Sequence, residues 1–281
     1  MSGLTHYEGL AHAITDAYPT LPNRLQRIAR FALDHPDQMA LLTVAEIAKA
    51  ASVPPSAVIR FANALGFQGF LALQRVYRER LVARSASYRE RIATLRKRGG
   101  GSNGVLPQLA DSAIDELEQL REHVDPTLFK RAAQAIAAAS RVHVVAQRRA
   151  FPVAAYLAYG LSQLEVPAFL LDSVGGMLRQ QASLLRGGDL LIAASFRNYS
   201  AEVVEAAEIC HANRVPVIAL TDHAISPLAK SASLRFDLGD NLALPFRSLV
   251  GPMCAAQALV IAVGYALGDA PQRGGRRKPR A

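Results

Sequence analysis

The first third of the chain repeats apolar residues at the three- and four-residue spacing of short amphipathic helices. Thr43 is followed three residues later by Glu46, a capping box that predicts a helix start at Val44. Gly66 supplies a C-terminal stop for the helix that follows. The stretch Asp34-His35-Pro36 predicts the end of the helix expected at residues 24–33. The helices are expected at residues 24–33, from 44 to about 51, 54–66 and 69–84.

From residue 105 onward, helical patterns alternate with short apolar runs. The runs LLIAAS and VPVIALT show no polar alternation, which is typical of parallel strands covered on both faces. The β-α-β-α order predicts an open, doubly wound parallel sheet. We expect strands at 141–146, 166–171, 189–194 and 215–221, and helices at 105–122, 126–139, 151–164, 176–185 and 201–212.

The two patterns are separated by a basic, glycine-rich stretch, RSASYRERIATLRKRGGGSNG, which is typical of a helix end followed by a flexible linker. The length of 281 residues is sufficient for two domains. The predicted fold class is therefore α/β, with an all-α N-terminal domain joined to a doubly wound parallel-sheet domain. The expected boundaries are 1–83, the linker 84–104, the α/β domain 105–270 and a basic, disordered tail 271–281.

Charge is unevenly distributed along this chain of net charge +9. Residues 1–100 hold 14 Lys and Arg against 7 Asp and Glu, whereas residues 101–270 hold 13 against 16. The last eleven residues add five basic groups. This distribution favours a polyanionic partner for the ends of the chain, with a merely solvated basic surface as the alternative.

Several classes of protein are disfavoured by the sequence. The first ten residues lack the pattern of a signal peptide. Leu249 to Gly268 is long enough to cross a membrane, but it contains Pro252 and Gln257, so we expect a core or interface helix. The two cysteines form no metal-binding spacing. We expect a cytoplasmic protein with no membrane partner, metal or cofactor.

The helices from Val44 and from Pro55 are joined by a short turn, which is the helix-turn-helix layout. The second helix has an apolar face and an opposite polar stripe of Ser56, Arg60 and Asn63. Arg can pair with guanine and Asn with adenine. An ordinary exposed helix face remains the alternative. The candidate DNA contacts are Thr43, Ser56, Ala57, Arg60 and Asn63.

The stretch TVAEIAKAASVPPSAVIRFANALGFQGF resembles the N-terminal helix-turn-helix domain of the RpiR/MurR family of bacterial transcription regulators. The resemblance covers about residues 22–83 and implies binding to double-stranded DNA. The family usually has Ser where this chain has Pro54. Losing that N-cap costs about 1 kcal/mol unless Ser52 or a DNA phosphate replaces it.

In open α/β sheets, ligands bind beyond the carboxyl ends of the strands. Three loops leave those ends: AQRRAF, SFRNYS and TDHAISPLAK. A hydroxyl-rich loop that enters a helix suits an oxyanion. The alternatives are solvated arginines and a Ser200 that serves only as an N-cap. The candidate effector contacts are Arg148, Arg149, Ser195, Arg197, Asn198 and Ser200.

About residues 125–268 resemble a SIS (sugar isomerase) domain, in which a Ser-x-Ser-Gly-x-Thr loop holds the phosphate of a phosphosugar. Ser195 and Ser200 match its first Ser and its Thr, whereas Arg197 and Asn198 replace its second Ser and its Gly. The family's Gly-x-Gly-x-Ser loop is absent from Ala146 to Ala150. The resemblance implies a homodimer or homotetramer and a small anionic effector, a phosphosugar or a sugar acid.

The leading hypothesis is a DNA-binding regulator that senses such an anion and has no catalytic residues. The alternative is a phosphosugar isomerase with an accessory helical domain, for which Glu202, His211 and His223 are the available bases. A third hypothesis is a structural DNA-associated protein with an empty pocket.

Overall fold

The computed structural model describes residues 7–85, 88–97, 102–239 and 246–268. The chain divides into two compact units. One comprises the residues up to Ser112 with two short later segments, and the other comprises most of the remaining chain. The first is helical and the second contains a five-stranded parallel sheet, so the predicted fold class is confirmed.

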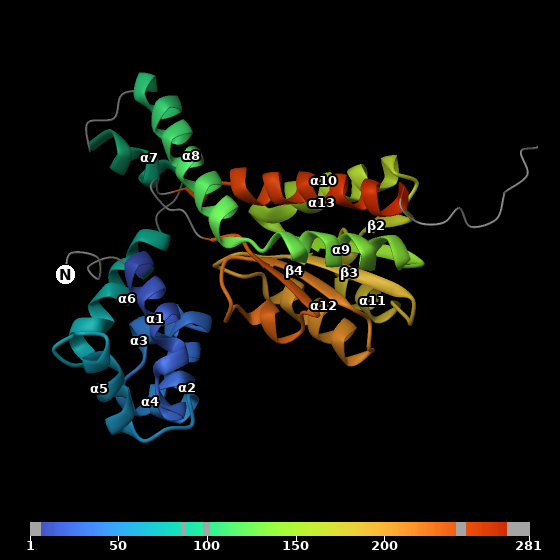
Figure 1. Ribbon diagram of the computed structural model, residues 1–281. Helices are drawn as coiled ribbons and strands as arrows, with labels where there is room; N and C mark the ends of the chain where they lie inside the picture. The colour runs from blue at the N-terminus through green and yellow to red at the C-terminus, as the bar shows by residue number, and fades with distance from the viewer. Residues whose placement is uncertain (1–6, 86–87, 98–101, 240–245, 269–281) are drawn as a thin grey trace, which may run out of the picture. The chain divides into compact units, whose positions relative to one another are not determined.

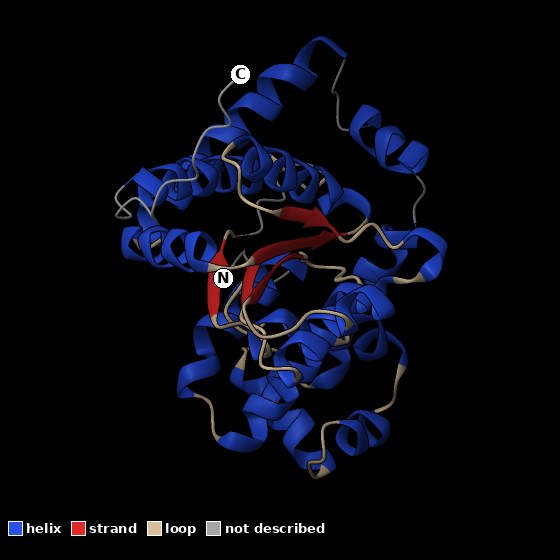
Figure 2. Cartoon of the chain, turned by 90° about the vertical axis from the view of Figure 1, so that its right-hand side faces the viewer, coloured by secondary structure: helices blue, strands red, loops and turns tan. Residues whose placement is uncertain are grey.

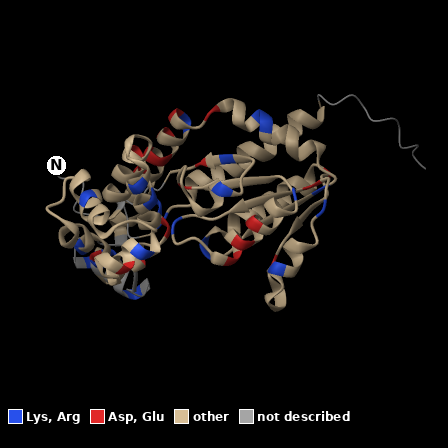
Figure 3. Cartoon of the chain, turned by 90° about the horizontal axis from the view of Figure 1, so that it is seen from below, with Lys and Arg blue, Asp and Glu red and all other residues tan. Residues whose placement is uncertain are grey.

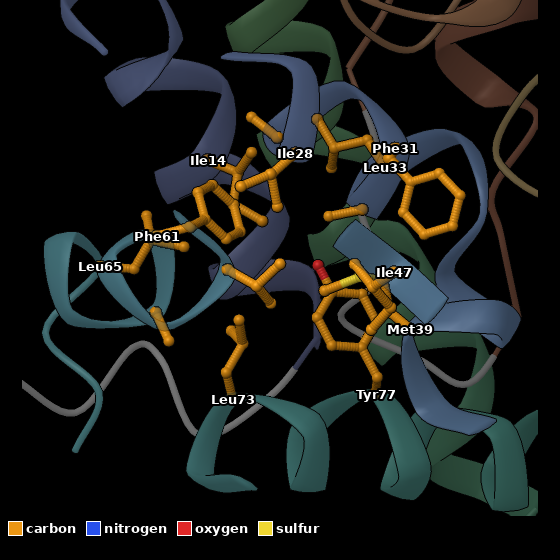
Figure 4. Packing of buried hydrophobic residues seen from close by; sticks show 14 of the residues in the cluster. Ile14, Ile28, Phe31, Leu33, Met39, Ile47, Phe61, Leu65, Leu73 and Tyr77 are labelled. Carbon is orange, nitrogen blue, oxygen red and sulfur yellow. The ribbon is translucent and has the colours of Figure 1, made fainter. Parts of the chain in front are cut away.

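The helical unit is built from short helices that enclose one apolar core (Figure 4). Ile14, Ile28, Phe61, Leu73 and Tyr77 meet there, and each is fully or almost fully buried. The helices are α1 (Tyr7–Ala17), α2 (Asn23–Asp34), α3 (Pro36–Leu41), α4 (Val44–Ala50), α5 (Pro55–Ala64), α6 (Phe70–Ser85) and α7 (Tyr88–Lys97).

The local signals around α4 and α5 act as the sequence predicts. The Thr43 backbone N–H donates to Glu46 Oε2 at 2.8 Å, and the Glu46 N–H donates to Thr43 Oγ1 at 3.4 Å, which completes the capping box. Gly66, with φ of 83°, lies just beyond α5 in the left-handed conformation that favours glycine. Pro54 is the N-cap of α5 and makes no side-chain cap bond.

The second unit is a three-layer α/β/α structure (Figures 1 and 2). Its five parallel strands lie in the order β2-β1-β3-β4-β5. Helices α9, α10 and α13 cover one face, and α11 and α12 cover the other. The strands are β1 (Arg141–Ala146), β2 (Ala168–Leu170), β3 (Asp189–Ala194), β4 (Val217–Thr221) and β5 (Leu234–Asp237). The helices are α8 (Val105–His123), α9 (Pro126–Ala138), α10 (Phe151–Gln163), α11 (Leu178–Ser183), α12 (Ala201–Ala212) and α13 (Val250–Gly268).

Some elements differ from the sequence-based expectation. The helix predicted at 176–185 begins only at Leu178, because Gly175 and Gly176 have φ of 65° and 74° and cannot continue a right-handed helix. Pro36, predicted only as part of a helix end, occupies the first turn of α3, where a missing N–H costs nothing. Helix α1, helix α7 within the expected linker, and the edge strand β5 had not been predicted from the sequence.

Helix α13 is long and apolar enough to cross a membrane by length and composition alone. In the structure, Ala255, Leu259 and Val263 lie in the core beneath one face of the sheet. The helix packs against α9 and α10. At the α10 crossing, a Cβ on Gly160 would lie only 2.9 Å from a methyl group of Val260. The burial of α13 supports its interpretation as a core helix.

Candidate functional sites

The first candidate site is the exposed face of α5. Ser56, Arg60 and Asn63 are all exposed, as the helical spacing predicts. Ala57 was predicted as a DNA contact, but its side chain is fully buried one turn before Phe61. It therefore does not belong to this exposed face. Arg60 is the charged side chain of the stripe, and a guanidinium there is able to pair with a base edge or a phosphate.

Two of the predicted DNA contacts also have structural partners. The Thr43 hydroxyl donates to Glu46 Oε2 at 2.7 Å within the capping box. The Asn63 side-chain oxygen accepts a hydrogen bond from the Gly69 backbone N–H at 3.2 Å. This bond braces the turn between α5 and α6. Asn63 therefore offers its amide N–H groups, rather than its oxygen, to a partner outside the protein.

The second candidate site lies where the strand order changes direction. Strands β1 and β3 are neighbours, and the helices that follow them, α10 and α12, lie on opposite faces of the sheet. The loops at the carboxyl ends of these two strands therefore lead to opposite faces of the sheet, and open α/β sheets bind ligands at this position. All six predicted effector contacts belong to these two loops.

Ser195 and Ser200 are brought together within the loop after β3. The Ser200 backbone N–H donates to Ser195 Oγ at 3.1 Å. The Ser200 hydroxyl lies 2.6 Å from Gln147 Oε1 and 2.5 Å from Glu202 Oε2. A hydroxyl has one proton, so both contacts are satisfied when the Gln147 amide turns its N–H₂ toward Ser200. Ser200 is the N-cap residue of α12, yet its side chain makes no cap bond.

The tip of this loop is held by a carboxylate from the next strand. Asp222, which follows β4, accepts the Arg197 backbone N–H at 2.7 Å and the Tyr199 hydroxyl at 2.5 Å. Between them, Asn198 has φ of 66°, a left-handed conformation that Asn tolerates better than most residues. Asn198 is exposed at this tip.

An arginine of the first loop contacts the loop after β3. Arg149 Nη2 lies 3.5 Å from the Arg197 carbonyl oxygen, at the limit of a hydrogen bond, so the two loops touch. Arg148 and Arg149 are both exposed. The Ser200 hydroxyl, with a smaller contribution from the charge of Arg148, holds the pKa of Glu202 below its ordinary value. Glu202 is therefore an anion at neutral pH.

The sequence analysis did not identify three residues of this site. Gln147, Tyr199 and Asp222 all lie within the three loops that follow predicted strands. Their position at the carboxyl ends of strands could have indicated that they belong to the site. They were not chosen because each lies next to basic or hydroxyl-bearing residues, which were the stronger candidates for binding an anion. The pairing of Asp222 with Arg197 depends on β3 and β4 being neighbours.

Of the three residues considered for catalysis, His223 follows Asp222 at the end of β4, whereas Glu202 and His211 lie on α12. His211 lies in the last turn of α12, about 16.5 Å along the helix from Ser200 at 1.5 Å per residue. Glu202 is in the first turn and is held in its charged form. Within the residues that the structure describes, no group of three or more His, Cys, Asp or Glu side chains could hold a metal ion.

Comparison with known families assigns both units. Residues 8–81 match the helix-turn-helix domain of the rpiR family, and residues 135–262 match the SIS domain. The chain is 25% identical over 213 residues to the HTH-type transcriptional regulator HexR of Pseudomonas aeruginosa, covering 76% of this chain and 73% of HexR.

Two solved structures share the fold. The sugar isomerase domain of an RpiR transcription factor from Sphaerobacter thermophilus is 26% identical, with a TM-score of 0.56 over 59% of this chain and 93% of that domain. The NanR protein of Vibrio vulnificus, complexed with ManNAc-6P, is 19% identical with a TM-score of 0.57. That alignment covers 92% of this chain and 93% of NanR.

Proposed function

Since this chain belongs to the RpiR family of helix-turn-helix regulators that carry a SIS domain, we propose that it binds duplex DNA through α4 and α5 and senses a small anionic metabolite at the loops after β1 and β3. The observation that carries the proposal is the presence, in one chain, of the exposed polar face of α5, which we call the reading face, and of two contacting loops rich in hydrogen-bond donors at the strand ends. Such a regulator acts on DNA in the cytoplasm.

The proposed effector is a phosphosugar or a sugar acid. Ser195 and Ser200 supply hydroxyls, Asn198 an amide, and Arg148, Arg149 and Arg197 guanidinium groups, which form charge-assisted hydrogen bonds with oxyanions. The structure of NanR with ManNAc-6P supports a sugar phosphate as the class of ligand. The arginines that replace the usual hydroxyl and glycine positions are also suited to a carboxylate.

The reading face is tested by Arg60→Ala. If Arg60 pairs with a guanine, this change should cost roughly 1–3 kcal/mol of operator affinity and relax the preference at one base pair. The measurement is binding and footprinting at fixed salt on an operator selected in vitro. Unchanged affinity and preference would rule out a base-reading role for Arg60.

The effector site is tested in two steps. A thermal-shift screen of the full chain against phosphosugars, sugar acids and small carboxylates identifies a ligand, because a ligand of the native state raises the unfolding temperature. Calorimetry then compares variants. Arg197→Ala should weaken binding roughly 10–100-fold, since a charge-assisted bond contributes about 1.5–3 kcal/mol.

Arg149→Ala provides a second, exposed variant of the effector site, and Arg131→Ala on α9 is the matched control. Unchanged ligand affinity in both Arg197→Ala and Arg149→Ala would place the ligand elsewhere. DNA affinity without effector should stay the same in all three. Isomerase turnover that disappears in Glu202→Gln would instead support the enzyme interpretation.

We also propose that the chain forms a homodimer or homotetramer through α13. Five residues at helical spacing form its exposed stripe: Val250, Cys254, Gln257, Ile261 and Tyr265. The stripe contains no charged residue, and Ile261 and Tyr265 are 54% and 75% exposed. A face of this kind is more typical of an interface than of solvent-exposed surface.

A further inference from the structure

The helical unit contains a basic hollow outside α4 and α5. Its volume is about 600 Å³, and it is lined from α2 and the turn before it by Tyr18, Asn23, Arg24, Gln26, Arg27 and Arg30. The segment from residue 18 to residue 33 contains three arginines and no Asp or Glu. Figure 3 shows other Lys and Arg residues spread over this unit. Among the residues that the structure describes, the lining of the hollow therefore contains three basic side chains and no acidic one.

One wall of the hollow is fixed by internal contacts. Arg30 Nη2 donates to the Tyr18 hydroxyl at 3.3 Å, and its guanidinium lies 5.9 Å from the centre of the Tyr18 ring. Gln26 Nε2 donates to the Tyr18 carbonyl oxygen at 3.0 Å. These contacts order Arg30 before any ligand binds, which reduces the entropy cost of binding.

The other two arginines of the hollow, Arg24 and Arg27, are exposed to solvent. They lie three residues apart, so they are neighbours on the surface of α2. Helix α2 packs directly against the reading helix α5 within the same compact unit. The hollow and the reading face therefore belong to one compact unit, on two helices that pack against each other.

We propose that this basic hollow is a second DNA contact, which binds backbone phosphates of the duplex beside the base pairs that α5 reads. The inference rests on the proposed DNA-binding function and adds a site to it. Arginine is suited to phosphate because its planar fork forms two parallel hydrogen bonds. Phosphate contacts fix the register and orientation of a protein on DNA without reading sequence.

The experiment measures how the affinity of the full chain for a random-sequence 30-base-pair duplex depends on salt between 50 and 200 mM. Each phosphate contact contributes about 0.9 to the slope of log affinity against log salt. Arg24→Gln combined with Arg27→Gln should lower the slope by about 1.8 per protomer. A second measurement uses an operator duplex. There, the preference of the double variant for the operator sequence should stay unchanged, and its hydroxyl-radical protection should disappear only at the flanks of the operator.

The matched control is Lys130→Gln with Arg131→Gln, two exposed cations of α9 whose loss changes the net charge equally. Arg24→Lys with Arg27→Lys keeps both charges and should retain most of the slope. If Arg24→Gln with Arg27→Gln gave the same salt slope as the control, the second contact would be wrong. A changed operator preference in that variant would contradict it as well. Wild-type protein that binds no duplex would overturn the proposed function itself.

Discussion

At the scale of single residues, Glu202 places a negative charge beside the side chains proposed to bind an anionic effector. Its carboxylate contacts the Ser200 hydroxyl, and its lowered pKa keeps it charged. Glu202→Gln removes this competing anion. We expect inorganic phosphate to bind roughly tenfold more tightly, or about 1.4 kcal/mol. Two unit charges 4 Å apart near a protein surface interact by about 4 kcal/mol, so the expected gain is a modest fraction of that interaction.

The matched control for this change is Glu208→Gln. Glu208 is exposed farther along the same helix, and its replacement changes the net charge by the same amount. Isothermal titration of phosphate into the three proteins gives the comparison. If Glu202→Gln bound phosphate no better than Glu208→Gln, Glu202 would not compete with the anion.

At the scale of elements, the crossing of α10 and α13 is set by a glycine. A Cβ at Gly160 would meet Val260 methyl groups at 2.9 and 3.1 Å. Valine is stiff in a helix, so it does not rotate away easily. Gly160→Ala should therefore destabilise the α/β unit by about 1–2 kcal/mol, because overpacking outweighs the better helix propensity of alanine.

Gly264 provides the comparison within the same helix pair. A Cβ there would lie 3.6 Å from Leu164, an ordinary contact, so Gly264→Ala should stabilise the unit by about 0.5–1 kcal/mol through helix propensity. Urea unfolding followed by circular dichroism measures both changes. Equal shifts of the two midpoints in the same direction would show that the crossing is not tightly packed.

At the scale of the whole molecule, the exposed stripe of α13 predicts assembly. Ile261→Glu places a charge in the stripe and should convert the assembled full chain to monomers in light scattering at micromolar concentration. Leu184→Glu is the control, because Leu184 is 70% exposed just after α11, on the opposite face of the sheet. Monomeric wild-type protein, or equal effects of the two substitutions, would contradict an α13 interface.

The two cysteines give a second readout of the same assembly. Cys254 lies in the stripe and is exposed in the single chain, whereas Cys210 is buried. Burial raises the pKa of the Cys210 thiol to about 12, so it should not react with thiol reagents near neutral pH. Cys254 should label slowly in the wild-type protein and rapidly in Ile261→Glu.

The sequence by itself determined most of the elements and the loops that matter. Periodicity located β1, β3 and α12, and capping chemistry located the start of α4, because both signals depend on residues within a few positions of one another. The family resemblance assigned the two domains. The carboxyl ends of β1 and β3 indicated the candidate effector loops before any tertiary contact was known.

Tertiary structure alone decided which residues meet. Ser200 contacts Gln147 across 53 positions, and Arg197 contacts Asp222 across 25. The order of the strands brings these loops together, and local patterns do not encode that order. Ala57 was assigned to the wrong side of α5, because only packing shows where an apolar face ends. The short edge strand β5 is defined by its pairing with β4, since four residues carry too little periodicity to be recognised alone.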